Sequence, residues 1–307
     1  MNPRPRIVSL LASATEIVDA LGLDDRLVGI SHECDHPPHL LDRPRLSRPR
    51  FDPEGLSSAE IDRAVRAAMR EHGSVYEIDA DRLERLAPDL VLTQAVCEVC
   101  AVPTPGVEQV VRGRGIDARV LSLDAHTLDE ILDTIRQVGR AAGVPDRADE
   151  VVAGLTQRLD AVAAAVRDAP APHVLAIEWL DPPFSPGHWV PEQIERAGGR
   201  SLIGERGGHS RELDRADVAG LDPDVLVVMP CGYGLNATLA EADAHTAWLC
   251  EIAPRAIDAG RTFAVDGSSF FNRSGPRAVR GVEILAGLLH PERVPAPSPA
   301  EARVWPA

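Results

Sequence analysis

The sequence contains no lysine, because all 32 of its basic residues are arginines. A chain without lysine cannot form a lysine Schiff base, and it lacks the phosphate-binding lysine of P-loop proteins and kinases. The arginines are outnumbered by 47 acidic residues, which gives a formal net charge of -15. We therefore expect no nucleic-acid partner, since phosphate binding requires a basic surface.

Long hydrophobic runs are also absent, and no apolar stretch approaches the roughly 20 residues that a membrane helix needs. We expect no membrane insertion. Two arginines, apolar residues 7–11 and a small-residue motif at 12–14 imitate a weak secretion signal. The same residues predict a strand at 6–10 and a helix capped by Ser13 and Glu16. Because cleavage after residue 14 would destroy that unit, we expect a cytoplasmic protein.

Two segments of the chain share one pattern. Residues 87–97 and 222–231 each contain a Pro-Asp turn, a short apolar strand and a cysteine just past the end of the strand. The likeness extends to their neighbours, since residues 6–10 match 173–177 and residues 119–124 match 262–266. We therefore predict an α/β fold with two lobes, each built on a mainly parallel sheet with buried strands.

A helix is predicted between the lobes, because apolar side chains recur at helical spacing over residues 146–168. We predict one long rigid helix that bridges the two lobes. The predicted organisation is an N-terminal α/β lobe over 1–143, the bridging helix over 144–169, a C-terminal α/β lobe over 170–292 and a tail over 293–307. We expect the Pro- and Ala-rich tail to be loosely held.

Residues with reactive or aromatic side chains follow five of the predicted strands. In parallel α/β sheets, ligands bind beyond the carboxyl ends of the strands. Only 4% of the chain is aromatic, so aromatic rings on these segments favour a large planar or chelated ligand. The candidate ligand-binding residues are His32, Glu178, Trp179, His188, Trp189, Tyr233, Phe271 and Asn272.

Four of the five cysteines also follow predicted strands; they are Cys34, Cys97, Cys100 and Cys231. Four thiolates suit a tetrahedral zinc ion or an iron–sulfur cluster. Inert buried thiols and redox or catalytic thiols are the alternatives. A thioredoxin-type role for the pair at 97 and 100 is disfavoured, because Pro103 and Pro105 leave no room for a helix to continue. We expect the fifth cysteine, Cys250, in the core of a helix.

Common catalytic motifs are missing as well. The sequence has no G-x-S-x-G elbow, no H-E-x-x-H and no phosphate-binding loop. A protein that only binds a ligand is therefore favoured over an enzyme. The alternative is a metalloprotein, or an enzyme, in which the four cysteines hold an iron–sulfur cluster or zinc at the lobe interface.

Over residues 5–290 the chain resembles the helical-backbone, or class III, substrate-binding proteins of ABC importers of cobalamin, siderophores and haem. Residues 7–16, the two Pro-Asp strands and the bridging helix carry the resemblance. It is closest to a branch of cobalamin-binding proteins that lacks a signal peptide and has motifs like those at 32–35, 97–100 and 229–232. The resemblance implies a two-lobed fold with cobalamin or a similar corrinoid held between the lobes.

The resemblance also bears on a protein partner. Exported members of the family dock on their permease through a glutamate on each lobe. At those places this chain has Asp81 and Ala216, which makes docking on an ABC permease doubtful. The expected partner is a small molecule or metal chelate.

Overall fold

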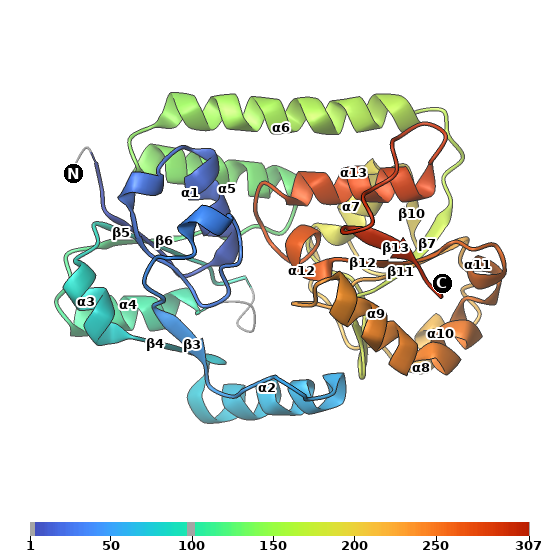
Figure 1. Ribbon diagram of the computed structural model, residues 1–307, viewed down its shortest axis with the longest axis horizontal. Coiled ribbons are helices and arrows are strands. Elements are labelled where there is room, and N and C mark those ends of the chain that lie inside the picture. The colour runs from blue at the N-terminus through green and yellow to red at the C-terminus, as the bar shows by residue number, and fades with distance from the viewer. Residues whose placement is uncertain (1–3, 97–101, 307) are drawn as a thin grey trace. The chain divides into compact units, whose positions relative to one another are not determined.

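The computed structural model describes residues 4–96 and 102–306 of the 307-residue chain. The chain, which Figure 1 colours by residue number, divides into two compact units. Unit 1 comprises residues 1–125, 129–154 and 274–276, and unit 2 comprises residues 126–128, 155–273 and 277–307. Each unit has its own mainly parallel sheet, which confirms the predicted α/β fold class. In the described part of the chain, no helix is both long enough and apolar enough to cross a membrane.

The sheet of unit 1 is four-stranded and parallel, in the order β2-β1-β5-β6. Its central strands β1 and β5 are fully buried, as expected for strands covered on both faces. The strands are β1 (Ile7–Ser9), β2 (Leu27–Gly29), β5 (Leu90–Thr93) and β6 (Arg119–Ser122), with a small antiparallel pair β3 (Ser47–Pro49) and β4 (Tyr76–Ile78). The helices are α1 (Ala12–Ala20), α2 (Ser58–His72), α3 (Ala80–Leu86), α4 (Thr104–Gly113) and α5 (Leu128–Ala141).

The sheet of unit 2 has the order β10-β7-β11-β12-β13, with only β13 antiparallel to its neighbour. The strands are β7 (His173–Ile177), β10 (Arg200–Ser201), β11 (Val225–Val228), β12 (Thr262–Val265) and β13 (Ala302–Val304), beside a hairpin of β8 (Trp179–Leu180) and β9 (Pro183–Phe184). The helices are α7 (Val190–Arg196), α8 (Arg215–Val218), α9 (Leu235–Ala244), α10 (Thr246–Ile252), α11 (Pro254–Asp258), α12 (Gly267–Phe270) and α13 (Ala278–Leu289).

The internal repeat inferred from the sequence appears in both sheets as the same strand order, β1-β5-β6 and β7-β11-β12. The Pro-Asp turns have one structural role. In unit 1, the Asp89 carboxylate accepts a hydrogen bond from the backbone N–H of Arg6 at 2.7 Å. In unit 2, Asp224 does the same for His173, also at 2.7 Å. Each aspartate therefore fixes the start of its own strand against the start of the neighbouring strand.

The long helix between the repeats is α6 (Pro145–Val166), which is continuous over 22 residues (Figure 1). At 1.5 Å per residue, its length is about 33 Å. Unit 1 includes its residues up to Gly154, and unit 2 includes those from Leu155 onward. The sequence prediction of one long helix at this place is confirmed.

One local prediction about a helix start is wrong. Helix α1 begins at Ala12 without a side-chain cap, so Ser13 lies inside the helix, where its hydroxyl contacts that of Ser274 at 3.3 Å. The first helix after residue 101, α4, begins only at Thr104, with the extended Pro103 as its N-cap and Pro105 in its first turn, so no helix runs through Pro103, in line with the prediction. Proline fits there because the first helical N–H groups have no partner within the helix.

The expectation of a loosely held tail is also wrong. Residues 302–304 form β13, which pairs with β12 at the edge of the sheet of unit 2. The next residue, Trp305, is only 3% exposed, and its indole N–H donates to Asp243 at 2.7 Å. The composition of the segment suggested disorder, but one tryptophan and one strand pairing hold it in place.

Candidate functional site

The segments that follow β7, β11 and β12 are bound to one another in unit 2. The N–H of Cys231, after β11, donates to the carbonyl of Glu178, after β7, at 3.0 Å. The N–H of Ser268, after β12, donates to the carbonyl of Tyr233 at 3.0 Å. Gly267 permits this approach, because a Cβ at that position would collide with the carbonyl oxygen of Pro230. The prediction that strand exits gather holds for these three strands.

A buried carboxyl group lies at the carboxyl ends of these strands. Glu178 accepts hydrogen bonds from the hydroxyl of Ser210 and from the amide Nδ2 of Asn272, the latter at 3.2 Å. Burial raises the pKa of Glu178 to about 7, although both hydrogen bonds act in the opposite direction. The other amide atom of Asn272, Oδ1, is buried and has no hydrogen-bond partner among the described residues. The structure therefore brings together two predicted residues, Glu178 and Asn272, and adds Ser210.

The aromatic residues predicted for the site differ in exposure. Trp179 and Tyr233 are half-buried, and their rings meet edge to face at 5.3 Å between centroids. Burial, followed by the charge of Glu241, raises the pKa of Tyr233 to about 12, so its hydroxyl stays protonated. Trp189 is only 7% exposed, and Phe271 has no exposed surface. A ligand could therefore contact Phe271 only after the surrounding side chains move.

Three histidines gather in unit 2, although the sequence pointed only to His188. The Nδ1 atoms of His126 and His188 are 3.3 Å apart. The ring of His209 lies 5.1 Å from that of His188 and 5.6 Å from that of His126, between centroids. Burial, together with the other two imidazoles, lowers the pKa of His188 to about 4, so this ring is neutral at pH 7.

The sequence reasoning missed His126, His209 and Ser210 for two different reasons. His126 follows the predicted strand at 119–124, so the rule that ligands bind beyond strand ends could have found it. His209 and Ser210 lie in a loop between β10 and α8 that follows only a two-residue strand. Nothing in the hydrophobic pattern marks that loop as part of a site.

The predicted residue His32 lies in unit 1. Its Nδ1 is 2.7 Å from the hydroxyl of Ser47, and its Nε2 is 3.0 Å from the carboxylate of Glu33. Its ring lies 4.8 Å from that of Tyr76. These neighbours hold the imidazole in place within unit 1.

The structure separates the cysteines into different environments. Cys34 of unit 1 is 2% exposed, and its sulfur lies 3.1 Å from the hydroxyl of Thr15. Cys231 of unit 2 is half-buried, whereas Cys97 and Cys100 lie outside the described residues. The four-cysteine site therefore stays a prediction. Cys250 is exposed on α10, which corrects its expected place in a helix core; Trp248, Leu249 and Ile252 are the buried residues of that helix.

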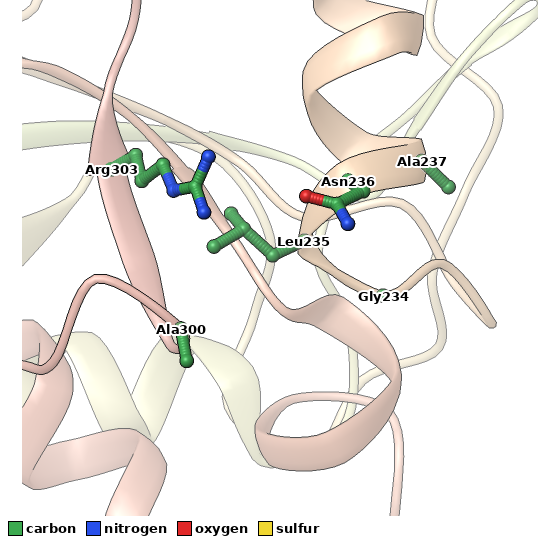
Figure 2. Close-up of a pocket in the computed structure, with 6 residues that line it drawn as sticks. All are labelled: Gly234, Leu235, Asn236, Ala237, Ala300 and Arg303. Carbon is green, nitrogen blue, oxygen red and sulfur yellow. The ribbon is translucent and has the colours of Figure 1, made fainter.

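Two hollows in the structure lie apart from the Glu178 group. One, of about 330 Å³, lies in unit 2 between the start of α9 and β13. Figure 2 shows the Arg303 guanidinium and the Asn236 amide directed toward each other above Leu235. The other, of about 620 Å³, lies in unit 1 and is lined largely by charged side chains, together with Ser47, the partner of His32.

Comparison with protein families shows to which family this chain belongs. The model of the periplasmic binding protein family matches residues 7–246. The chain belongs to this family. It is therefore a ligand-binding protein of the periplasmic-binding-protein type, which is associated with ABC transporters.

Curated members of the periplasmic binding protein family are similar along most of the chain. An uncharacterized ABC transporter substrate-binding lipoprotein of Bacillus subtilis is 24% identical over 94% of this chain and 80% of its own length. A vitamin B12-binding protein of Vibrio cholerae is 22% identical over 94% of this chain and 90% of its own length.

Solved structures of periplasmic binding proteins share the fold. A periplasmic heme-binding protein of Pseudomonas aeruginosa is 25% identical, with a TM-score of 0.70, and 96% of each chain is covered. The periplasmic vitamin B12 binding protein of Vibrio cholerae is 21% identical, with a TM-score of 0.68, and 94% of this chain and 97% of that chain are covered. These matches agree with the predicted class III architecture.

Proposed function

We propose that this protein binds a corrinoid, such as cobalamin, or a closely related metal chelate, without catalysing a reaction on it. The observations that carry the proposal are the group formed by Glu178, Ser210 and Asn272 and the Trp179–Tyr233 ring pair, which lie on segments joined by the hydrogen bond from Cys231 to Glu178. Two similar proteins are named for vitamin B12 and for heme, which supports a large metal chelate as the ligand class.

The hydrogen-bonding atoms of Glu178, Ser210 and Asn272 suit a ligand whose rim carries uncharged polar groups. A carboxyl group with a pKa of about 7 is largely protonated in mildly acidic solution, where it can donate a hydrogen bond as well as accept one. The buried Oδ1 of Asn272 is an acceptor without a partner among the described residues. The amide groups around a corrin ring offer both donors and acceptors. The two aromatic rings provide apolar surface for the macrocycle itself.

Calorimetric titration of the full chain with cyanocobalamin tests this proposal. We expect saturable heat and quenching of tryptophan fluorescence. Trp179→Leu should weaken binding about fivefold, because a lost aromatic contact costs on the order of 1 kcal/mol. Trp248→Phe removes an indole from the core of unit 2 and serves as the matched control. If the protein gives no heat with cyanocobalamin but binds hemin, a corrinoid is not its ligand. The broader proposal of a metal chelate as the ligand would then stand.

A separate proposal concerns the cysteines. We propose that Cys231 contributes its thiol to the same site at the carboxyl ends of the strands, because its backbone N–H is bound to the carbonyl of Glu178. An iron–sulfur cluster or zinc held by this residue with Cys34, Cys97 and Cys100 is the alternative function. Metal and sulfide analysis after anaerobic purification separates the two, since only the alternative requires a bound metal.

We also propose a cytoplasmic location. The support for it is that β1 lies between β2 and β5 in the sheet, so cleavage after Ala14 would remove a central strand of unit 1. Fractionation of cells that express the full chain tests this proposal. Recovery in the soluble cytoplasmic fraction is expected, and recovery of an exported, shortened chain would contradict it.

A further inference from the structure

The three histidines of unit 2 come from separate segments of the chain. His126 lies between β6 and α5, His188 directly precedes Trp189 and α7, and His209 lies in the loop between β10 and α8. Their ring centroids are 5.4, 5.6 and 5.1 Å apart. The two closest nitrogen atoms, Nδ1 of His126 and Nδ1 of His188, are 3.3 Å apart.

The nitrogen separation of His126 and His188, and the spacing of the three ring centres, match those of imidazoles that share one ion. With metal–nitrogen bonds of about 2.0 to 2.1 Å in a tetrahedral arrangement, two ligand nitrogens lie about 3.3 Å apart and two ring centres about 5 Å apart. We infer that His126, His188 and His209 form a binding site for a divalent first-row transition-metal ion. Neutral imidazoles suit zinc, nickel and copper ions, whereas calcium and magnesium prefer oxygen ligands.

The site needs one movement to be completed. Among the described residues, only the group of Asp19, Asp24 and His39 already has three ligand atoms within 4.8 Å of one another. The rings of His126 and His188 are in place. The third ring, of His209, stands edge-on to both and belongs to an exposed residue. Rotation about the side-chain bonds of His209 is therefore the step that brings its nitrogen to the ion.

One buried carboxylate holds all three segments together. Glu192 on α7 has a side chain that is 1% exposed. It accepts hydrogen bonds from the backbone N–H of Leu128 at 2.9 Å and from Arg196 at 2.9 Å, and it pairs with Arg206 at 2.8 Å. Leu128 is two residues from His126, and Arg206 is three residues from His209. Glu192 is thus a positioning residue, in the way that outer partners orient metal ligands.

The loops that carry His188 and His209 are also joined through their backbones. The N–H of His188 donates to the carbonyl of Gly208, and the N–H of Gly207 donates to the carbonyl of His188 at 2.8 Å. A Cβ at Gly187 would collide with the backbone nitrogen of Ser210, so only glycine permits this approach. The spacing of the histidines is therefore set by the fold.

Zinc titration of the full chain, stripped of metal and without any chelate ligand, tests the inference independently of the proposed corrinoid. We expect one zinc equivalent that disappears in His209→Gln and in His126→Gln, with at least a 10- to 100-fold loss of affinity. X-ray absorption of the zinc-loaded protein should show Zn–N distances of about 2.0 to 2.1 Å for this equivalent, rather than the Zn–S distance of about 2.3 Å expected for cysteine ligands.

His39→Gln is the matched control, because His39 belongs to the group with Asp19 and Asp24. This variant should bind zinc as the parent does. Since His209 is exposed, its substitution should leave the fold intact, which circular dichroism verifies. Equal zinc affinity in the parent and in His209→Gln would overturn the inference. Loss of the equivalent in His39→Gln, or purely sulfur coordination, would also overturn it.

Discussion

Burial acts in opposite directions on two titratable side chains of unit 2. It raises the pKa of Glu178 to about 7 and lowers the pKa of His188 to about 4, because in each case the charged form loses its hydration. For Glu178, hydrogen bonds from Ser210 and Asn272 partly offset this effect. For His188, repulsion from the neighbouring imidazoles adds to it. Both effects favour neutral side chains in unit 2.

The shifted carboxyl group predicts how stability depends on pH. The pKa of Glu178 is raised from 4.5 to about 7 in the folded protein, so between these values the folded state binds more protons than the unfolded state. The free energy of unfolding must therefore fall as the pH rises from about 4.5 to 7, by about 3 kcal/mol in total. Glu178→Gln removes this dependence and should gain stability relative to the parent at pH 8.

Urea denaturation of both proteins at pH 5 and at pH 8 measures this effect. Glu251→Gln is the control, because Glu251 is exposed on α10 and should leave the pH dependence unchanged. If Glu178→Gln shows the same loss of stability between the two pH values as the parent, the buried carboxyl group is not its source.

At the scale of elements, the last strand shows how a short segment can be held firmly. β13 adds three residues to the sheet of unit 2. The side chain of Trp305 belongs to the buried hydrophobic cluster of that unit, which also includes Leu226 and Ala264. Glu301, just before the strand, forms an ion pair with Arg280 on α13 at 2.8 Å. Backbone pairing, apolar burial and an ion pair thus together hold residues 301–305 in place.

Trp305→Ala should destabilise the protein by roughly 3 to 5 kcal/mol, as expected when a buried tryptophan is truncated. Val304→Ala is the neighbouring control, since Val304 is 49% exposed and should change stability by no more than about 0.5 kcal/mol. Denaturation followed by circular dichroism compares the two. Equal effects of the two substitutions would show that the tail contributes little.

At the scale of the whole molecule, the chain uses one construction twice. Each unit contains its own buried hydrophobic cluster, and each has a Pro-Asp turn that fixes one strand to the next. All four tryptophans, at positions 179, 189, 248 and 305, lie in unit 2. Tryptophan fluorescence therefore reports on unit 2, whereas far-ultraviolet circular dichroism reports on both units.

The paired aspartates provide a test of independent unfolding. Asp224→Ala and Asp89→Ala each remove an acceptor for a backbone N–H, at a cost of about 1 to 3 kcal/mol. Because each unit has its own core, we expect Asp224→Ala to lower the urea midpoint seen by tryptophan fluorescence. Asp89→Ala should leave that midpoint in place and shift only the transition seen by circular dichroism. Equal shifts of the fluorescence midpoint would show a single cooperative unit.

The sequence predicted most of the architecture because its signals are local. Apolar strands after Pro-Asp turns, and helical spacing over 146–168, depend on neighbouring residues only, and the structure has both. The same reasoning brought together Glu178 and Asn272, since both follow strands. It failed for the tail, where pairing with a strand some forty residues earlier decides the outcome.

The histidine group could not be predicted as a whole for the same reason. Its geometry depends on Glu192, a glutamate in a helix that reads as an ordinary polar residue. The contacts of Glu192 with Leu128 and Arg206 join segments 64 and 14 residues away along the chain. No periodicity or motif encodes such contacts, so they are evident only in the folded structure.

The position of β13 has a consequence for handling the protein. Without this strand, β12 would present a row of unpaired backbone donors and acceptors, which is a template for pairing with another molecule. The natural strand is short, carries the exposed Arg303 and is followed by Pro306, features that discourage further strand addition. Proteolytic clipping between residues 291 and 301, followed by loss of the released strand, would therefore expose the edge of β12 and make the protein prone to aggregation.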